Sequence, residues 1–283
     1  MANSYLNMLT FVLCTIGYYL AIKPKITYTQ FIDPEEYKKY TKNTYTNLGI
    51  YLLLVMVIQF IVNTMAIGAT CGGSISQNLG AAALYTFLPW SLMFGVLLIV
   101  LTMYPGFKSA FADVIGYFFI SGSANKVLTE LLIDKNVQQK IDGNQEASAE
   151  QKKYMEDAAD AIIKICGNTS ILINQIVPSN FKEYWEILKP LMKSRYQTDT
   201  PETLEQQNKL FEIVMTRDNI GEAMWYLYTG ILLTSIVQLN IATRGCINNS
   251  ATMQANYQAY LDQENQAQQQ QQQATSQVYT ITN

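Results

Sequence analysis

The sequence predicts an all-α membrane protein in which four transmembrane helices carry a helical insert that faces the cytosol. Two observations support this prediction. Residues 43–107 of the 283-residue chain contain no charged side chain, and a charge at the centre of a membrane-spanning helix costs about 2.5–3.5 kcal/mol. Four segments are also apolar over the roughly 20 residues that a helix needs to cross the hydrocarbon core.

The predicted spans divide residues 1–104 into three transmembrane helices with short loops and make residues 223–243 a fourth helix. Their bounds are Tyr5–Ile22, Leu48–Gly68, Ala81–Tyr104 and Ala223–Thr243. The first span is expected to remain as an anchor, because Lys23 and Lys25 follow it, whereas a signal peptide carries basic residues before its apolar stretch. Pro89 should kink the third span.

Lysine and arginine predict the orientation. With four spans, residues 23–47 and 105–222 lie on the same side of the membrane. These two segments carry five and thirteen of the 19 basic residues, and only Arg244 falls on the other side. Because basic residues concentrate in cytosolic loops, we expect this side to be cytosolic.

The insert, residues 105–222, is expected to be helical and to begin with an amphipathic helix. Its first apolar residues recur at helical spacing. They are Phe107, Phe111, Val114, Ile115, Phe118 and Phe119. Because this stripe follows the third span directly, it predicts a helix that lies on the membrane surface. The alternative is that the stripe is the core face of the insert.

Apolar periodicity predicts three more helices in the insert. A linker at residues 142–149 is expected to divide the insert into a membrane-proximal part and a more soluble part. The helices cover residues 127–132, 155–166 and 181–191. Pro190 should kink or end the last of these, because proline lacks the backbone N–H that an α-helix uses.

A further helix start is predicted at Thr200 and Pro201, since threonine caps helices well and proline suits the first helical position. This helix should run to about Arg217. Asp218 is then expected to cap the fourth membrane helix.

The tail, residues 244–283, is rich in glutamine and has six consecutive Gln at 268–273. This composition favours disorder, or a helix that forms on a partner. Residues 277–282 alternate as a strand would. Cys71 and Cys246 both fall just outside spans on the far side, where an oxidising compartment would let them form a disulfide. The alternative is two unrelated thiols.

The chain lacks the common signatures of catalysis. It contains no histidine, which excludes Ser-His-Asp and Cys-His catalysis and the most frequent metal ligand. No cysteine pair has the spacing of a zinc site, and no glycine loop matches a phosphate-binding motif. Its basic residues are dispersed among 22 acidic ones, unlike a nucleic-acid footprint. We therefore expect no enzyme, no cofactor, no metal and no nucleic-acid partner.

Three aromatic residues of the insert are candidates for binding a partner protein, because aromatic side chains dominate interface hot spots. They are Tyr184, Trp185 and Tyr196. The alternative is that these rings form the core of the insert.

Polar side chains within the spans suggest a second function. Gln59, Asn63 and Gln238 would lie at depth in the membrane. They are expected to form hydrogen bonds between helices. The alternative is that they line the lumen of a channel or a viroporin-like homo-oligomer.

Residues 105–119, PGFKSAFADVIGYFF, resemble a segment in multi-spanning inner-membrane and minor capsid proteins of large double-stranded DNA viruses. The shared elements are a Pro-Gly-aromatic exit from a span, a following Phe, and Gly116-Tyr117. The chain has Asp113-Val114 where such proteins often have Asn-Thr.

The resemblance implies a structural protein of the virion internal membrane, or of the host endomembrane from which that membrane derives. Such a protein would anchor the membrane to the capsid shell through its insert. The implied partners are the lipid bilayer and capsid or other virion proteins. The resemblance implies no active-site residue.

Overall fold

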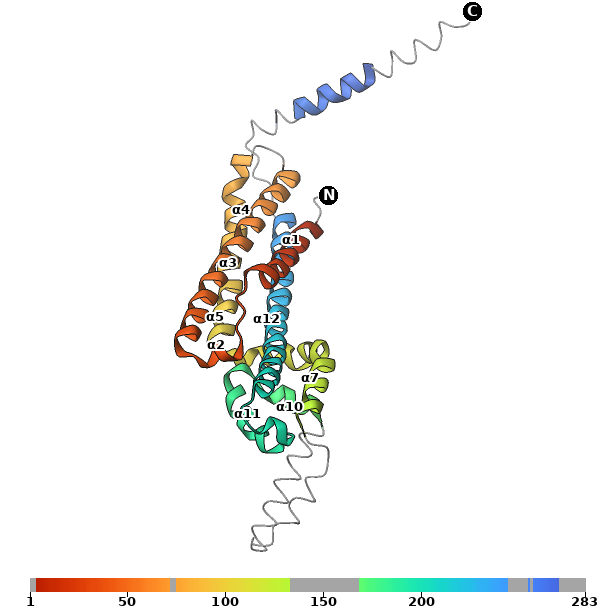
Figure 1. Cartoon of the computed structure of the whole chain (residues 1–283). Helices are drawn as coiled ribbons and strands as arrows, with labels where there is room; N and C mark the ends of the chain where they lie inside the picture. Colours follow the sequence, from red (N-terminus) through yellow and green to blue (C-terminus); the bar gives the residue numbers. More distant parts are fainter. Residues whose placement is uncertain (1–3, 72–74, 133–167, 244–253, 255–256, 270–283) are drawn as a thin grey trace, which may run out of the picture.

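The computed structural model describes residues 4–71, 75–132, 168–243, 254 and 257–269 (Figure 1). Within these ranges every regular element is a helix. The only β-type pairing there is an isolated antiparallel bridge between Leu132 and Met192. The prediction of an all-α fold is therefore confirmed. The predicted linker at 142–149, helix at 155–166 and strand at 277–282 lie outside the described residues.

Four helical stretches among the described residues are long and apolar enough to cross a membrane, as in a multi-pass membrane protein. They are Tyr5–Ile22, Pro34–Cys71, Asn78–Met103 and Pro201–Thr243. The first comprises α1 (Ser4–Gly17) and a π-helical turn (Tyr18–Ile22), and the second is α3 (Pro34–Cys71). The third joins α4 (Ile75–Pro89) to α5 (Val96–Met103), and the fourth is α12 (Pro201–Thr243).

Two of these helices extend well beyond the predicted spans. Helix α3 begins at Pro34, so it includes most of the predicted 23–47 loop. Helix α12 continues through Asp218 without a break, which corrects the predicted cap at that residue. The Asp218 carboxylate instead accepts a hydrogen bond from Lys108 at 2.9 Å. The fourth span is thus the second half of a helix that starts far outside the apolar segment.

Pro89 lies where the regular α-helix of the third span is interrupted, while the kink itself stays a prediction. Pro89 ends α4, and a π-helical turn at Trp90–Gly95 follows before α5 begins. A wider turn accommodates the backbone hydrogen bond that proline cannot make.

Apart from the helical tail residues 254 and 257–269, the remaining described elements form a helical module, which we define as residues 23–32, 105–132 and 168–222. The module contains α2 (Tyr28–Ile32), α7 (Tyr117–Leu131), α10 (Thr169–Gln175), α11 (Phe181–Leu188) and the first half of α12. It lies at one end of the four-helix bundle in Figure 1. As predicted, Thr200 caps α12 through its hydroxyl, and α11 ends just before Pro190.

The module has its own hydrophobic core, and the segment after the first span contributes to it. The ring of Tyr28 lies 5.1 Å from that of Phe181 and 5.6 Å from that of Phe211. Burial of large aromatic side chains is the strongest apolar contribution to packing. Helix α2 is therefore part of the module rather than of a loop between spans.

Helix α12 links the module to the bundle. Its residues Leu210, Phe211 and Val214 belong to the module core, and Tyr226 and Leu233 belong to the main bundle core. Glycine allows the segment after the third span to approach this helix closely. A Cβ atom at Gly221 would lie 2.7 Å from the backbone oxygen of Lys108.

Candidate functional site at the junction of bundle and module

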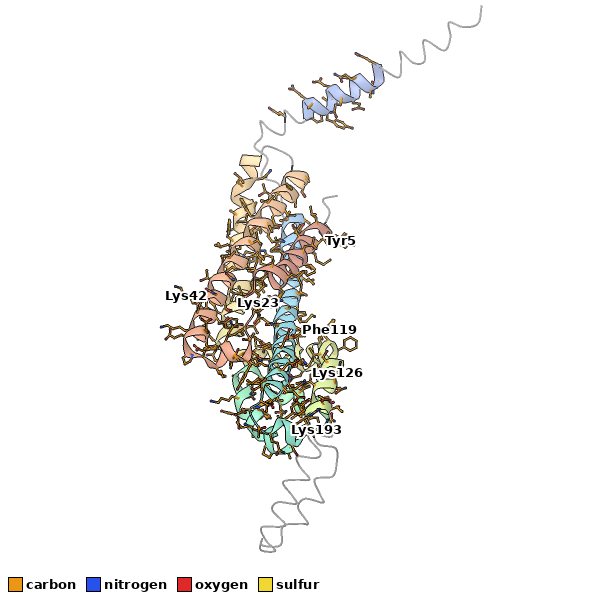
Figure 2. All side chains as sticks on the ribbon, in the orientation of Figure 1. Tyr5, Lys23, Lys42, Phe119, Lys126 and Lys193 are labelled. Atoms are coloured by element: carbon orange, nitrogen blue, oxygen red, sulfur yellow. The ribbon has the colours of Figure 1, made fainter. Side chains whose placement is uncertain are left out.

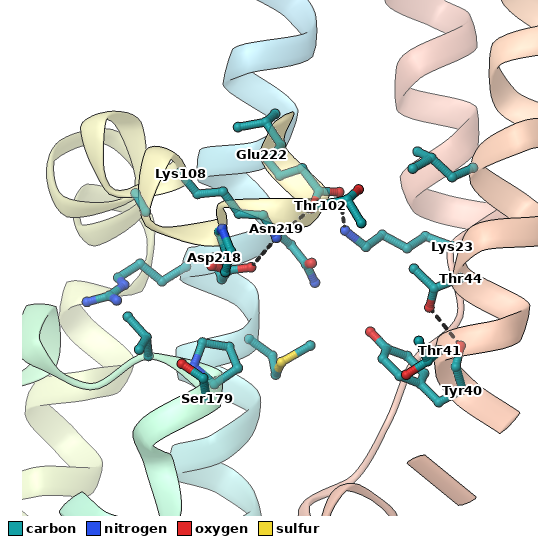
Figure 3. A pocket seen from close by; sticks show the side chains of 18 of the residues that line it. Lys23, Tyr40, Thr41, Thr44, Thr102, Lys108, Ser179, Asp218, Asn219 and Glu222 are labelled. Atoms are coloured by element: carbon teal, nitrogen blue, oxygen red, sulfur yellow. Dashed lines mark hydrogen bonds and ion pairs between the residues drawn. The ribbon is translucent and has the colours of Figure 1, made fainter. Parts of the chain in front are cut away.

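A buried cluster of charged side chains lies where the bundle meets the module (Figure 3). Lys23 follows the first span, and Lys108 ends the short 3-10 turn Pro105–Lys108. Asp218 and Glu222 lie one helical turn apart on α12. The two oxygens of Glu222 contact the Nζ atoms of Lys23 at 2.5 Å and Lys108 at 2.7 Å. This cluster joins three separate parts of the chain.

The cluster is nearly closed to solvent. Glu222 is 8% exposed, and its carboxylate also accepts a hydrogen bond from the hydroxyl of Tyr19 at 3.0 Å. Lys23 in turn lies over the Tyr19 ring. Buried charges are tolerated only when they are paired and hydrogen-bonded. The geometry meets that requirement for all four residues.

The two lysines differ in how firmly they hold their charge. Burial lowers the pKa of Lys23, and the attraction of Glu222 offsets this only in part. Burial also acts to lower the pKa of Lys108, but Glu222 and Asp218 together outweigh it and raise the pKa. Lys108, with two carboxylate partners, is therefore the more strongly held cation.

A cavity of about 400 Å³ opens beside the cluster. Its lining includes Leu48 and Leu101 from the spans and Val177 and Met215 from the module. Figure 3 shows Lys23 and Tyr40 on one wall and Asn219 on the other. The charged lining residues are Lys23, Lys108, Arg217, Asp218 and Glu222.

Two buried polar atoms on residues that line the cavity have no hydrogen-bond partner within the described part of the chain. They are the Tyr18 hydroxyl oxygen and the Arg217 Nε atom. The rest of the Arg217 guanidinium is well bonded, because it donates to the carbonyl oxygens of Ile173 and Ile176. Since buried polar groups are nearly always paired, an unpaired donor calls for an explanation.

A separate polar network lies within the bundle and contains the three amides considered for a channel. The Asn63 side chain accepts from Asn7 at 2.9 Å and from Gln238 at 3.1 Å, and it donates to Thr86 at 2.9 Å. Gln59 donates to the Asn7 carbonyl at 3.0 Å. Each of the four spans contributes to this network. The structure thus places these amides between helices, as expected for interhelical hydrogen bonds.

The predicted amphipathic stripe lies mostly on the outside of the module. Phe107, Val114, Phe118 and Phe119 are 55–76% exposed, whereas Phe111 and Ile115 are half-buried. The stripe is not one regular helix, because 3-10 and π-helical turns precede α7. Contact of these side chains with lipid stays a prediction, but the four exposed residues do not belong to the core (Figure 2 labels Phe119).

The three predicted partner-binding aromatics require a correction. Trp185 is 2% exposed and Tyr196 is 1% exposed, and both belong to the module core. Tyr184 is half-buried and packs against the same core. Helical periodicity identifies an apolar face but not whether that face meets another protein or the same chain, and here it meets the same chain.

None of the cysteines in the described part of the chain belongs to the charged cluster, and no metal site is found there. Cys71 is disulfide-bonded, while Cys246 lies outside the described residues, so a bond between these two stays a prediction. Cys14 is a buried free thiol. In the part of the chain that is described, no three His, Cys, Asp or Glu side chains gather as a metal site.

Sequence reasoning missed the charged cluster, although a signal was present. Lys23 and Lys108 immediately follow the first and third spans, and Asp218 and Glu222 immediately precede the fourth. All four therefore lie at the same end of the bundle. Their approach to one another depends on how the spans pack, which periodicity does not determine.

Comparison with known proteins found no matching family model, no matching curated protein and no matching solved structure.

Proposed function

We propose that the protein is a structural membrane protein of a large DNA virus, which anchors the internal membrane to the capsid shell through its helical module. The observation that carries this proposal is the continuity of α12, Pro201–Thr243, from the module core into the bundle core. An anchor must transmit force between the bilayer and its partner, and an unbroken helix is suited to that task.

The contacts around α12 support a rigid connection. The first half of α12 packs in the module core. In the charged cluster, Glu222 pairs with Lys23 at the end of the first span, and Asp218 pairs with Lys108 just after the third span. A flexible tether between membrane and module would instead need a polar linker with few contacts. The module is therefore held in a fixed position relative to the bundle.

The docking surface must lie on the exposed side of the module, since Trp185 and Tyr196 are internal. Lys126, Lys182 and Lys193 belong to the module and provide amino groups for crosslinking to a bound partner. Figure 2 labels Lys126 and Lys193. On the proposed topology these three lysines face the cytosol, where a capsid partner would bind.

Crosslinking mass spectrometry on the protein in its native membrane tests the proposal. Crosslinks from Lys126, Lys182 or Lys193 to a capsid-type protein are the expected result. Crosslinks only between copies of this chain would contradict it and favour a homo-oligomer. The channel alternative has less support, because Gln59, Asn63 and Gln238 belong to one network within a single chain. Conductance in planar bilayers would test it directly.

A further inference from the structure

The cavity beside the charged cluster has properties that anchoring does not require. Its volume of about 400 Å³ lies in the range of ligand pockets, roughly 300–1,000 Å³. One part of its lining is apolar, with Leu48 and Leu101 from the spans. The rest is polar, with hydroxyl groups from Tyr40, Thr41 and Ser179. An occupant should therefore have an apolar part and a polar part.

The polar part of the cavity has more hydrogen-bond donors than it uses. Three basic side chains line it against two acidic ones. The charge of Arg217 is met from outside the lining by Asp113, at 3.9 Å, so Lys23 and Lys108 face Asp218 and Glu222. An ammonium group has three donors, and the one carboxylate that Lys23 contacts in the described chain is Glu222. The unused donors of the Lys23 ammonium favour a ligand that is rich in acceptor oxygens.

The cavity lies at the end of the spans, where lipid headgroups would be. Tyr18, Tyr40, Tyr45 and Tyr226 all line it, and tyrosine concentrates at this depth in membrane proteins. We propose that the cavity binds a phosphate ester, with the phosphate facing Lys23 and the apolar part along Leu48 and Leu101. The apolar wall identifies the source as a phospholipid of the adjoining leaflet.

A soluble phosphate compound could also contact Lys23, but it would leave the apolar lining at Leu48 and Leu101 without a partner. The inference requires only that the protein is a multi-pass membrane protein. It does not depend on docking to a capsid protein, so a failure of either proposal leaves the other intact.

A matched pair of substitutions separates this site from nonspecific lipid contact. Thr44 lines the cavity, and within the described part of the chain its hydroxyl bonds to Tyr40 of its own helix. Thr44→Phe should fill the cavity without removing a contact between helices. Thr46 makes the same kind of bond, to the Lys42 carbonyl, but is exposed and does not line the cavity. Thr46→Phe is therefore the control.

The full-length protein, stripped of lipid in detergent, would be titrated with three probes and followed by thermal shift and native mass spectrometry. The probes are phosphatidylglycerol, diacylglycerol without phosphate, and glycerol 3-phosphate without acyl chains. We expect the wild type and Thr46→Phe to bind phosphatidylglycerol equally. Thr44→Phe should bind it at least about tenfold more weakly, which corresponds to a loss of about 1.4 kcal/mol.

Equal binding of phosphatidylglycerol by Thr44→Phe and Thr46→Phe would overturn the site. If diacylglycerol binds as tightly as phosphatidylglycerol, the proposal that the cavity recognises a phosphate group is wrong. If glycerol 3-phosphate binds as tightly as phosphatidylglycerol, the proposal that the ligand is a phospholipid is wrong. If Thr44→Phe fails to fold, a phospholipid with a photoreactive headgroup tests the wild type alone. Labelled peptides from residues 37–48 or 105–112 would support the proposal, and labelling confined to other peptides would overturn it.

Discussion

At the scale of single residues, the chain places charge and amide groups where apolar side chains would be expected, and it pairs them. Glu222 forms ion pairs with two lysines from distant parts of the sequence. Asn63 forms hydrogen bonds with side chains from the three other spans. Both residues bring together segments that are distant in the sequence.

Replacing Glu222 with Gln should destabilise the protein strongly. The substitution leaves Lys23 and Lys108 buried with less compensation, and loss of one partner from a buried ion pair costs about 3–5 kcal/mol. Thermal or chemical unfolding of the purified protein would measure the loss. The control is Glu205→Gln on the same helix, whose pair with Lys209 is exposed and contributes about 1 kcal/mol at most. Similar effects of the two variants would refute the role assigned to the cluster.

Replacing Asn63 with Ala should cost less. Hydrogen bonds between helices within membranes contribute about 0.6 kcal/mol each on average, and Asn63 makes three. We expect a loss of about 1–2 kcal/mol, measured by unfolding in detergent. Thr64→Ala is the control, because among the described residues the Thr64 hydroxyl bonds to the Phe60 carbonyl of its own helix and to no other span. A destabilised control and an unchanged Asn63→Ala would contradict the network.

At the scale of elements, the close approach between α12 and the segment that follows the third span determines how the module sits on the bundle. Gly221 is one point of contact, and Gly116 approaches the backbone of Arg217 in a similar way. The atoms that would meet a Cβ at Gly221 belong partly to the backbone, namely Lys108 O and Ala112 N. Backbone atoms move less readily than the end of a flexible side chain.

Gly221→Ala should therefore destabilise the protein by about 1–3 kcal/mol, the usual cost of overpacking. Gly122→Ala is the matched control, since a Cβ atom at this position in α7 would meet no neighbouring atom within 4 Å. Alanine favours helices over glycine by up to about 1 kcal/mol, so the control should be neutral or stabilising. Unfolding midpoints of the two variants give the comparison, and a stabilised Gly221→Ala would show that the contact is loose.

At the scale of the whole molecule, bundle and module should unfold together, because α12 belongs to both cores. Two tryptophans report on the halves separately: Trp90 in the bundle core and Trp185 in the module core. Single-tryptophan variants should give coincident unfolding midpoints, the test of a cooperative transition. Ile220→Pro should break α12 at a cost of about 3 kcal/mol or more and separate the midpoints. Separate midpoints in the unbroken chain would contradict a rigid connection.

Local sequence patterns were enough to predict several features of the fold. Apolar length identified the four spans, and Thr200-Pro201 identified the start of α12, because both signals act within a few residues. The interior positions of Trp185 and Tyr196 could not be predicted, since an amphipathic face does not reveal its partner. The continuity of α12 through Asp218 was missed, because a charged residue at the edge of an apolar segment resembles a helix cap. In the folded chain that charge is paired with Lys108 instead.

The chain order of the charged cluster has a consequence for biosynthesis. Lys23 and Lys108 are made before Glu222, so after three spans the growing chain carries both lysines without this partner. If the lysine-rich side is cytosolic, as proposed, unpaired lysines at span ends favour keeping their segments on that side during insertion. The arrival of α12 then covers them. The same two residues would thus direct topology while the protein is being made and close the junction once it is complete.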